Sequence, residues 1–431
     1  MAYEEAVAEK EALASNDSLW RNHNFLLLWI GQSAGELGPQ IATIAIPLIA
    51  AKTLNASAFE VSLITFLGWF PYLVFSLPAG VIADRLDQRK LMIFCDFGRM
   101  ALILSVPLVA TLGHLTLGYL YVVVACIGVL TVLFNVAYRS QLPRLIRRSQ
   151  LVDANGKLGV SMSLAELVGP ALAGALAGLV GLTKTLFANA LTLLASATTL
   201  WLISLPKSAD PDPDPAVPAP TSVLKEMVAG LVFVRRDSIL WKVLLCTTTS
   251  NFFVMASTSI EVVFLVRVLD ASSLVVGLVY TASAVGGLVA GALALKICEI
   301  VGTARIIWVS MLAPGPLYLL MPFAMPGWGV LLFSIGLAVF SVNATLFNVA
   351  GTSYRQAVCP PELLSRVNAA FLWICYGAIP LGALFGGLVG SWFGLRTGIL
   401  VCVLGMWSAS LFVVFSPLRR MRDVPALDTI E

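Results

Sequence analysis

The chain has 431 residues, of which 58% are hydrophobic and 12% are charged, and its mean hydropathy is +0.90. Soluble domains carry about 25% charged residues, so this composition excludes a water-soluble globular protein and indicates lipid as the solvent. The formal net charge of +3 gives no indication of a nucleic-acid partner, because the basic residues are dispersed along the chain.

The N-terminal segment, residues 1–23, is acidic and polar. It lacks the basic start and apolar centre of a cleavable signal peptide, so we expect a retained cytoplasmic tail. Apolar segments of the length that a transmembrane helix needs, about 20 residues, then alternate with short polar breaks. The predicted spans of the first half are 24–51, 59–83, 91–112, 115–138, 154–180 and 183–205.

A proline-dense, acidic segment at 206–220 follows the first six spans. Proline lacks a backbone N–H and disrupts helices, so we expect an extended, solvated linker. Val223–Arg236 is predicted to form an amphipathic helix on the cytoplasmic membrane surface. Residues 206–238 would thus connect two six-span domains, at 24–205 and 239–417.

The second half contains six more apolar segments, followed by a short tail at 418–431. An even number of spans places both termini on the same side of the membrane. The predicted spans are 239–267, 273–298, 304–324, 328–350, 365–390 and 394–417.

The positions of Lys and Arg predict the orientation. With cytoplasmic termini, Arg99 falls within a span and only four of the 27 basic residues lie on external connections. The others then lie on the cytoplasmic side, as the positive-inside rule requires. We therefore expect a multi-pass protein of the inner (plasma) membrane with both termini in the cytoplasm. The four external basic residues are Lys52, Lys184, Arg267 and Arg396.

The two halves are related in sequence. The pentapeptide LFNVA at 133–137 recurs at 346–350, and the same offset pairs Asn155 with Asn368 in the following span. Chance could produce one shared pentapeptide in so apolar a chain, but the continued register favours duplication. The predicted fold is an all-α polytopic membrane protein with twelve transmembrane helices in two pseudo-symmetric six-helix bundles.

The loop between the second and third spans has the sequence GVIADRLDQRK. It resembles the cytoplasmic GxxxDRxGRRK signature of the major facilitator superfamily, a family of transporters. The resemblance implies a gating latch in which the glycine allows close helix approach and the aspartate acts across the interface between the halves. The residues concerned are Gly80, Asp84, Arg85, Arg89 and Lys90.

This loop departs from the signature at two positions. Asp87 and Gln88 stand where glycine and arginine are usual, so we expect the turn to be built differently. A solvated charged loop that only follows the positive-inside rule is the alternative interpretation.

The fifth span contains Gly169, Pro170 and Gly174 within a run of small residues. Small residues at four-residue spacing let helices approach closely in lipid, and Pro170 loosens the helical hydrogen-bond ladder. The run resembles the gating motif of drug-exporting antiporters in the same superfamily, although Ala173 replaces a glycine that is common there. Generic helix packing is the alternative.

Further resemblance lies in the first span, with LWIGQ at 28–32, and in the loop with QLP at 141–143. These segments are similar to the branch that includes macrolide-type and enterobactin exporters. The resemblance extends over nearly the whole chain apart from the tails and the linker. It implies export of a hydrophobic or amphipathic small molecule and does not specify which one.

Two acids, Glu36 and Glu166, lie deep in the first and fifth spans. An ionised acid at the bilayer centre costs on the order of 2.5–3.5 kcal/mol by insertion scales, so it faces a cavity, pairs with a base or takes up a proton. We interpret both as proton-coupling candidates. Gln32 and Gln40, one turn from Glu36, are candidate cavity residues. Hydrogen-bonded acids that fix helix packing are the alternative.

Asp96 and Arg99 form an i,i+3 pair in the third span. We interpret them primarily as a structural ion pair, with a role in the inward gate as the alternative. Glu261 and Arg267 approach the outer end of the seventh span and are interpreted as rim residues.

The seventh span is unusually polar, with TTTSN at 247–251. Because these groups are poorly placed against lipid, we expect the face with Asn251 to line the substrate cavity. Phe252, Trp373 and Tyr376 are candidates for its apolar wall, although aromatic side chains fill any helix bundle.

The sequence predicts a secondary active transporter that exports small molecules in exchange for protons and functions as a monomer in the bilayer. An importer or facilitator of a nutrient or lipid-like metabolite is the alternative. The sequence has no GxxxxGKS loop, GxSxG elbow or Cys/His cluster, so we expect no enzyme activity, cofactor or metal site. The seven cysteines are expected to be reduced packing residues.

Overall fold

The computed structural model describes residues 19–146, 150–203 and 223–423, and this part of the chain is helical without a strand. The predicted N-terminal tail up to residue 18, the proline-rich linker segment and the last eight residues of the C-terminal tail, 424–431, lie outside the described residues.

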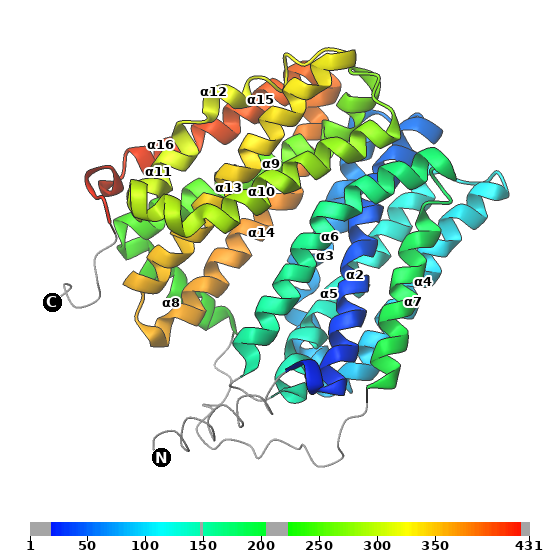
Figure 1. Ribbon diagram of the computed structural model, residues 1–431, viewed down its shortest axis with the longest axis horizontal. Helices are drawn as coiled ribbons and strands as arrows, with labels where there is room; N and C mark the ends of the chain where they lie inside the picture. The colour runs from blue at the N-terminus through cyan, green and yellow to red at the C-terminus, as the bar shows by residue number, and fades with distance from the viewer. Residues whose placement is uncertain (1–18, 147–149, 204–222, 424–431) are drawn as a thin grey trace, which may run out of the picture.

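The first half consists of six long helices in the predicted order (Figure 1). The first of them continues into a π-helical turn at Ile49–Thr53, and the fourth continues to Leu145 rather than ending at 138. The helices are α2 (His23–Leu48), α3 (Ala58–Arg85), α4 (Gln88–Thr111), α5 (Leu117–Leu145), α6 (Leu151–Leu179) and α7 (Leu186–Leu202).

The second half has four continuous long helices and two interrupted ones. The continuous helices are α9 (Ser238–Arg267), α10 (Ser273–Val301), α13 (Val330–Val358) and α14 (Pro361–Trp392). The interrupted ones are α11 (Arg305–Leu312) with α12 (Gly315–Tyr318), and α15 (Leu395–Ser408) with α16 (Ser410–Val414).

The break between α11 and α12 has a cause in the sequence. Pro316 has no N–H to donate to the carbonyl of Leu312, and Pro314 likewise has none for the carbonyl of Ser310. The indole N–H of Trp407 donates to that Leu312 carbonyl at 3.0 Å. A side chain from α15 thus replaces the missing backbone hydrogen bond, as a medium without water requires.

Ten helices of the described chain are long and apolar enough to cross a membrane, and α15 with α16 counts as one of them. The other two predicted spans are α7, an apolar helix of 17 residues, and the interrupted segment of α11 and α12. The all-helical membrane fold is therefore confirmed, whereas the full count of twelve spans stays a prediction.

Each half packs mainly within itself, and two helix pairs make most of the contact between the halves (Figure 1). In the first half α2 packs against α6 and α7, and in the second α9 packs against α14 and α15. Between the halves, α3 packs against α14 and α6 against α10. The second and fifth helices of one half thus meet the fifth and second of the other, as expected for parallel repeats about a pseudo-two-fold axis.

The predicted amphipathic helix is present as α8, with the bounds Val223–Arg236. It packs against α14 and α9 of the second half. Gly230 makes this packing possible, because a Cβ atom there would lie 2.3 Å from the carbonyl oxygen of Arg366.

All seven cysteines are free, and only Cys126 is exposed. Within the described residues, no group of His, Cys, Asp and Glu side chains could hold a metal ion. The cysteine side chains therefore contribute to helix packing, since six of the seven are buried.

Glycine contacts set the spacing between α9 and α14. A Cβ atom on Gly386 would lie 2.0 Å from the carbonyl oxygen of Ala256, whereas one on Gly291 of α10 would lie 3.8 Å from its nearest neighbour. We expect Gly386→Ala to lower the unfolding free energy by about 1–3 kcal/mol through overpacking. Gly291→Ala, the control, should leave it unchanged or raise it through helix propensity. Thermal unfolding of both purified variants in detergent tests this, and equal midpoints would contradict it.

Candidate polar core and substrate cavities

The two predicted proton-coupling acids lie on neighbouring helices. The Ser33 hydroxyl of α2 donates to Ser161 Oγ of α6 at 2.8 Å, which fixes the contact between these helices. Glu36 on α2 is half-buried and lies in the electrostatic field of both Glu166 on α6 and Arg99 on α4. Its charge therefore depends on a second acid and a base, neither of which is close to it in sequence.

The two glutamines of α2 lie in helix contacts. Gln32 is buried, and its side chain lies close to the Tyr138 hydroxyl of α5. Gln40 packs against Gly169 of α6, where a Cβ atom would lie 2.4 Å from Gln40 Cβ. The small-residue run of α6 thus allows the close approach of α2 in addition to that of α10.

Asp96 and Arg99 form a buried ion pair through Asp96 Oδ1 and Arg99 Nη2, with side-chain exposures of 0% and 9%. Ser196 Oγ of α7 donates to Asp96 Oδ2 at 2.7 Å, and the guanidinium carbon of Arg99 lies 4.4 Å from the ring centre of Phe134 on α5. This pair therefore links α4 to α5 and α7 inside the first half.

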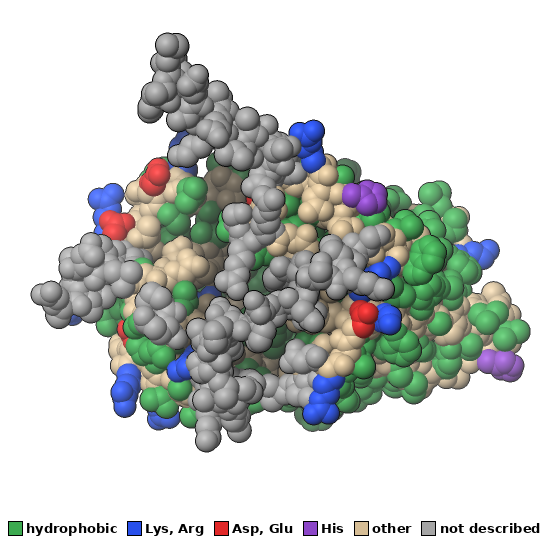
Figure 2. All heavy atoms as spheres, turned by 90° about the horizontal axis from the view of Figure 1, so that it is seen from below, with side chains coloured by type: hydrophobic (Ala, Val, Ile, Leu, Met, Phe, Trp, Pro, Cys, Tyr) green, Lys and Arg blue, Asp and Glu red, His purple; other side chains and the backbone are tan. Residues whose placement is uncertain are grey.

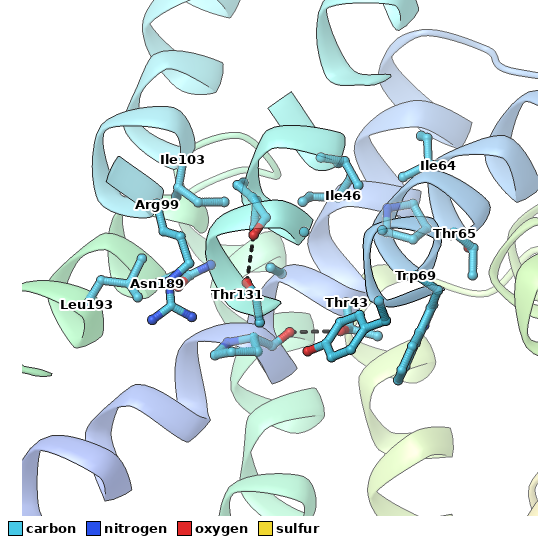
Figure 3. Close-up of a pocket in the computed structure, with 18 residues that line it drawn as sticks. Thr43, Ile46, Ile64, Thr65, Trp69, Arg99, Ile103, Thr131, Asn189 and Leu193 are labelled. Carbon is cyan, nitrogen blue, oxygen red and sulfur yellow. Dashed lines mark hydrogen bonds between the residues drawn. The ribbon is translucent and has the colours of Figure 1, made fainter. Parts of the chain in front are cut away.

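A cavity of about 270 Å³ lies among α2, α3, α4, α5 and α7 (Figure 3). Most of its lining is apolar, and Arg99 and Asn189 supply polar groups on one side while Trp69 and Thr65 of α3 lie on the other. Arg99 Nε and Asn189 Oδ1 are buried without a hydrogen-bond partner among the described residues. The cavity thus has an apolar wall with a cationic and an amide side chain at one side.

The structure brings Asn251 and Tyr376 together at a second cavity, of about 290 Å³, in the second half. Arg355 of α13 also lines it, donates to Thr352 Oγ1 at 3.0 Å and lies 4.5 Å from the ring centre of Phe371. Arg355 is not recognisable from the sequence as a cavity residue, because its position in the last turn of a helix resembles that of an ordinary interfacial arginine.

The other two aromatic candidates lie elsewhere. Phe252 packs against the ring of Phe385, with 5.3 Å between ring centres, and against Gly382 of α14. Trp373 is 46% exposed on α14. Tyr376 lies 6.2 Å, between ring centres, from Trp69 of the other half, so this ring pair spans the two bundles.

The interpretation of Glu261 as a rim residue is wrong. Its side chain is 2% exposed. Ser257 Oγ donates to it at 2.7 Å and the Tyr280 hydroxyl of α10 donates at 3.0 Å. Depth along a span does not reveal which face of the helix a residue occupies, and the contact with Tyr280 is not visible in the sequence.

Arg267 does lie where the two halves meet, and it donates to the Ala56 carbonyl at 2.7 Å. Lys52 Nζ donates in the other direction, to the Ala271 carbonyl at 3.3 Å. A third hydrogen bond joins the Phe59 amide to Ser391 Oγ at 3.0 Å. We call these three hydrogen bonds the outer clasp. All of its donors and acceptors lie at the end of the bundle opposite the N-terminus of α2.

Close backbone contact between α6 and α10 lies near the outer clasp. A Cβ atom on Gly277 would lie 2.3 Å from the carbonyl oxygen of Pro170 and 3.1 Å from Gly174 Cα. The three residues of the predicted fifth-span motif, Gly169, Pro170 and Gly174, therefore all lie in tight helix contacts.

The loop between α3 and α4 differs from the latch that its signature implies. A Cβ atom on Gly80 would meet no described atom within 4 Å, so the expected close helix approach is absent in this conformation. The physical reason is that the contacts between the halves gather at the opposite end, at the outer clasp. Asp84 lies in the last turn of α3, and its side chain lies outside the described part.

The basic residues of this loop act within the first half. Arg89 Nε donates to the Leu200 carbonyl at 2.7 Å, and its Nη2 donates to the Trp201 carbonyl, so it caps the C-terminal end of α7. Asp87 is the N-cap of α4, accepting from the Lys90 amide at 3.2 Å. The unusual aspartate thus builds the turn by helix capping. Arg85 is exposed at the end of α3.

Asp96→Asn should strongly destabilise the protein, because it leaves Arg99 buried without a counter-charge. The expected loss is about 3–5 kcal/mol of unfolding free energy. Asp153→Asn is the matched control, since it removes the i,i+4 partner of Lys157 from a pair with an exposed carboxylate and should cost below about 1 kcal/mol. Unfolding of both variants in detergent measures the difference, and similar losses would show that the buried pair adds no stability.

Comparisons with known proteins identify the family of the chain. The family model for the Major Facilitator Superfamily matches residues 28–383. Macrolide efflux protein A of Streptococcus pyogenes is 24% identical over 387 residues, covering 88% of this chain and 94% of that protein. Multidrug efflux pump Tap of Mycolicibacterium fortuitum is 25% identical over 412 residues, covering 93% and 97%.

Solved structures show the same fold at lower identity. A mutant of the nucleoside transporter NupG has a TM-score of 0.73 and 13% identity, covering 91% of this chain and 99% of that one. A bacterial homologue of the human lysosomal transporter Spinster, inward-facing and unoccupied, also has a TM-score of 0.73, with 17% identity and coverage of 91% and 96%. Since the family model matches most of the chain and the helices pair as two repeats, the protein belongs to the major facilitator superfamily and is a membrane transporter.

Proposed function

We propose that the protein exports hydrophobic or amphipathic small molecules in exchange for protons by alternating access. The observation that carries this proposal is the position of Glu36, half-buried in a membrane-spanning helix and within the field of Glu166 and Arg99. The names of two relatives, a macrolide efflux protein and a multidrug efflux pump, support export as the direction.

The chemistry follows from the charges around Glu36. Arg99 is already paired with Asp96, so it balances only part of the charge of two further carboxylates. A proton on Glu36 or Glu166 relieves their mutual repulsion, and its loss is favoured when a cationic or polar substrate approaches. Proton movement down a membrane potential supplies about 2.3 kcal/mol per 100 mV and charge, which can drive export.

Alternating access requires that the halves separate at one end while they close at the other. The outer clasp and the α6–α10 contact close the end opposite the start of α2. With cytoplasmic termini, this conformation is open to the cytoplasm, from which an exporter takes its substrate. Trp373 and Tyr376 of α14 are exposed, and they provide aromatic surface for an apolar molecule.

We place the protein in the inner (plasma) membrane, as a monomer with cytoplasmic termini. Figure 2 shows Lys and Arg side chains spread over the face that lies below in Figure 1, and hydrophobic side chains over the flank at the right. The excess of Lys and Arg in the segments that the sequence predicts to be cytoplasmic supports this orientation. The two transport domains are residues 24–205 and 239–417, connected by 206–238.

Glu36→Gln and Glu166→Gln are expected to reduce proton-driven transport to the background of empty vesicles, because an amide cannot exchange a proton. Everted vesicles with an acid interior, tested for uptake of a labelled macrolide and of a fluorescent amphipathic dye, provide the measurement. Glu299→Gln is the control, since Glu299 is an exposed acid near the end of α10 and should transport like the parent protein.

Full proton-driven uptake in both Glu36→Gln and Glu166→Gln would show that coupling lies elsewhere. Substrate uptake by intact cells, combined with no uptake by everted vesicles that have an acid interior, would instead support the alternative function. That function is import or facilitated transport of a nutrient or lipid-like metabolite.

Gly277→Ala should prevent full closure at the outer clasp, because its Cβ would collide with the Pro170 carbonyl. Spin labels at His114→Cys and Trp328→Cys, in a Cys126→Ser background, report the separation of the halves at that end. We expect a larger fraction of long distances than in the parent or in Gly291→Ala. An unchanged distance distribution would mean that the α6–α10 contact does not limit closure.

A further inference from the structure

Glu261 is a buried acid that the proposed coupling site in the first half does not use. It lies in α9 of the second half with 2% of its surface exposed. Each carboxylate oxygen has one donor: Ser257 Oγ reaches Oε1 at 2.7 Å, and the Tyr280 hydroxyl reaches Oε2 at 3.0 Å. Ser257 precedes Glu261 by one turn of the same helix, whereas Tyr280 comes from α10.

No cationic side chain among the described residues pairs with Glu261 or acts on it at close range. The titratable groups that face it are Tyr280 of α10 and Cys402 of α15. On the other sides α14 presents Gly386 and Gly390 to α9, and α13 contributes hydroxyl, amide and apolar groups. Two hydroxyl donors do not balance a full negative charge inside a membrane, so the ionised form lacks a counter-ion.

A cavity of about 280 Å³ adjoins this carboxyl group. Its lining from α9, α10 and α13 is rich in hydroxyl and amide groups, which favour water over a dry apolar filling. Besides Ser257, Glu261 and Tyr280, the polar residues that line it are Thr258, Ser283, Ser341, Thr345 and Asn348. Glu261 is therefore buried from bulk solvent but lies beside a polar space through which a proton can reach it.

We propose that Glu261, Ser257 and Tyr280 form a second proton-binding site, located in the second half, which controls closure at the outer clasp. A proton from the solvent binds to one carboxyl oxygen and leaves the residue neutral. That oxygen then donates a hydrogen bond, so the hydroxyl group that donated to it must turn and accept, or separate from it. Loss of the proton to solvent restores both original hydrogen bonds.

The position of the three residues connects this change to the contact between the halves. Tyr280 lies one turn from Gly277, which packs against Pro170 of the first half. Glu261 lies less than two turns before Arg267, which donates to the Ala56 carbonyl of the first half. The carboxyl group thus holds α9 to α10 directly beneath the two places where these helices contact the other half.

This inference rests on the proposed proton-driven transport and extends it. Proton binding at Glu36 and Glu166 would accompany substrate exchange, whereas proton binding at Glu261 would accompany the opening and closing of the outer end. Both halves would then handle protons, although only the first contains the paired acids.

Difference infrared spectroscopy of the purified, reconstituted protein tests the site, because a protonated carboxyl group has a carbonyl stretching band that a carboxylate lacks. In a pH titration we expect a band that persists in the Glu36→Gln/Glu166→Gln double variant and disappears when Glu261→Gln is added to that variant. In Tyr280→Phe the band should persist to higher pH, since one donor to the ionised form is lost. This variant also keeps the test valid should Glu261→Gln fail to fold.

The link to closure is tested with the spin labels at positions 114 and 328. The distance between them should change with pH in the parent protein and should lose that change in Glu261→Gln. A titrating band that survives when Glu261→Gln is added to the double variant, or a pH-dependent distance that survives in Glu261→Gln, would overturn the proposal. Neither measurement needs a transported substrate, so failure of the vesicle assay and failure of this site are separate results.

Discussion

Hydrocarbon offers no hydrogen-bond partner to a backbone group or a charge, and the structure satisfies this constraint from within the chain. Trp407 supplies the hydrogen bond that Pro316 cannot make, and Arg89 binds the free carbonyls at the end of α7. Asp96 and Arg99 neutralise each other at a depth where neither could stay alone. Glu261 has two hydroxyl donors and no counter-charge among the described residues, which makes it the acid of the second half that we propose to bind a proton.

The same constraint shapes the interface between the halves. A transporter must separate these surfaces repeatedly, and a buried acid–base pair across them would expose an unpaired charge at each separation. The interface instead uses glycine contacts between α6 and α10, and donors such as Arg267 that bind carbonyl oxygens. Water can replace either kind of contact at low cost once the end opens.

The sequence predicted the helices well and the long-range contacts poorly. Hydropathy located the long apolar helices because each has about the length that a lipid bilayer requires. It could not show that Arg89 reaches the end of α7 or that Tyr280 reaches Glu261, since these contacts depend on how helices are placed. For this reason Glu261 was wrongly predicted to lie at the rim. The close helix approach predicted at Gly80 is absent for a related reason, because it depends on which end of the bundle is closed.

The outer clasp has a consequence for how this protein can diverge in sequence. Arg267 and Lys52 bind the main chain, at the carbonyls of Ala56 and Ala271, and every amino acid carries that acceptor. Substitution of residue 56 or 271 therefore leaves the carbonyl acceptor in place. Of the two partners in each hydrogen bond, only the donor side chain, Arg267 or Lys52, can be removed by a substitution. A substitution at residue 56 or 271 that preserves the local backbone conformation therefore leaves the bundle its means to close.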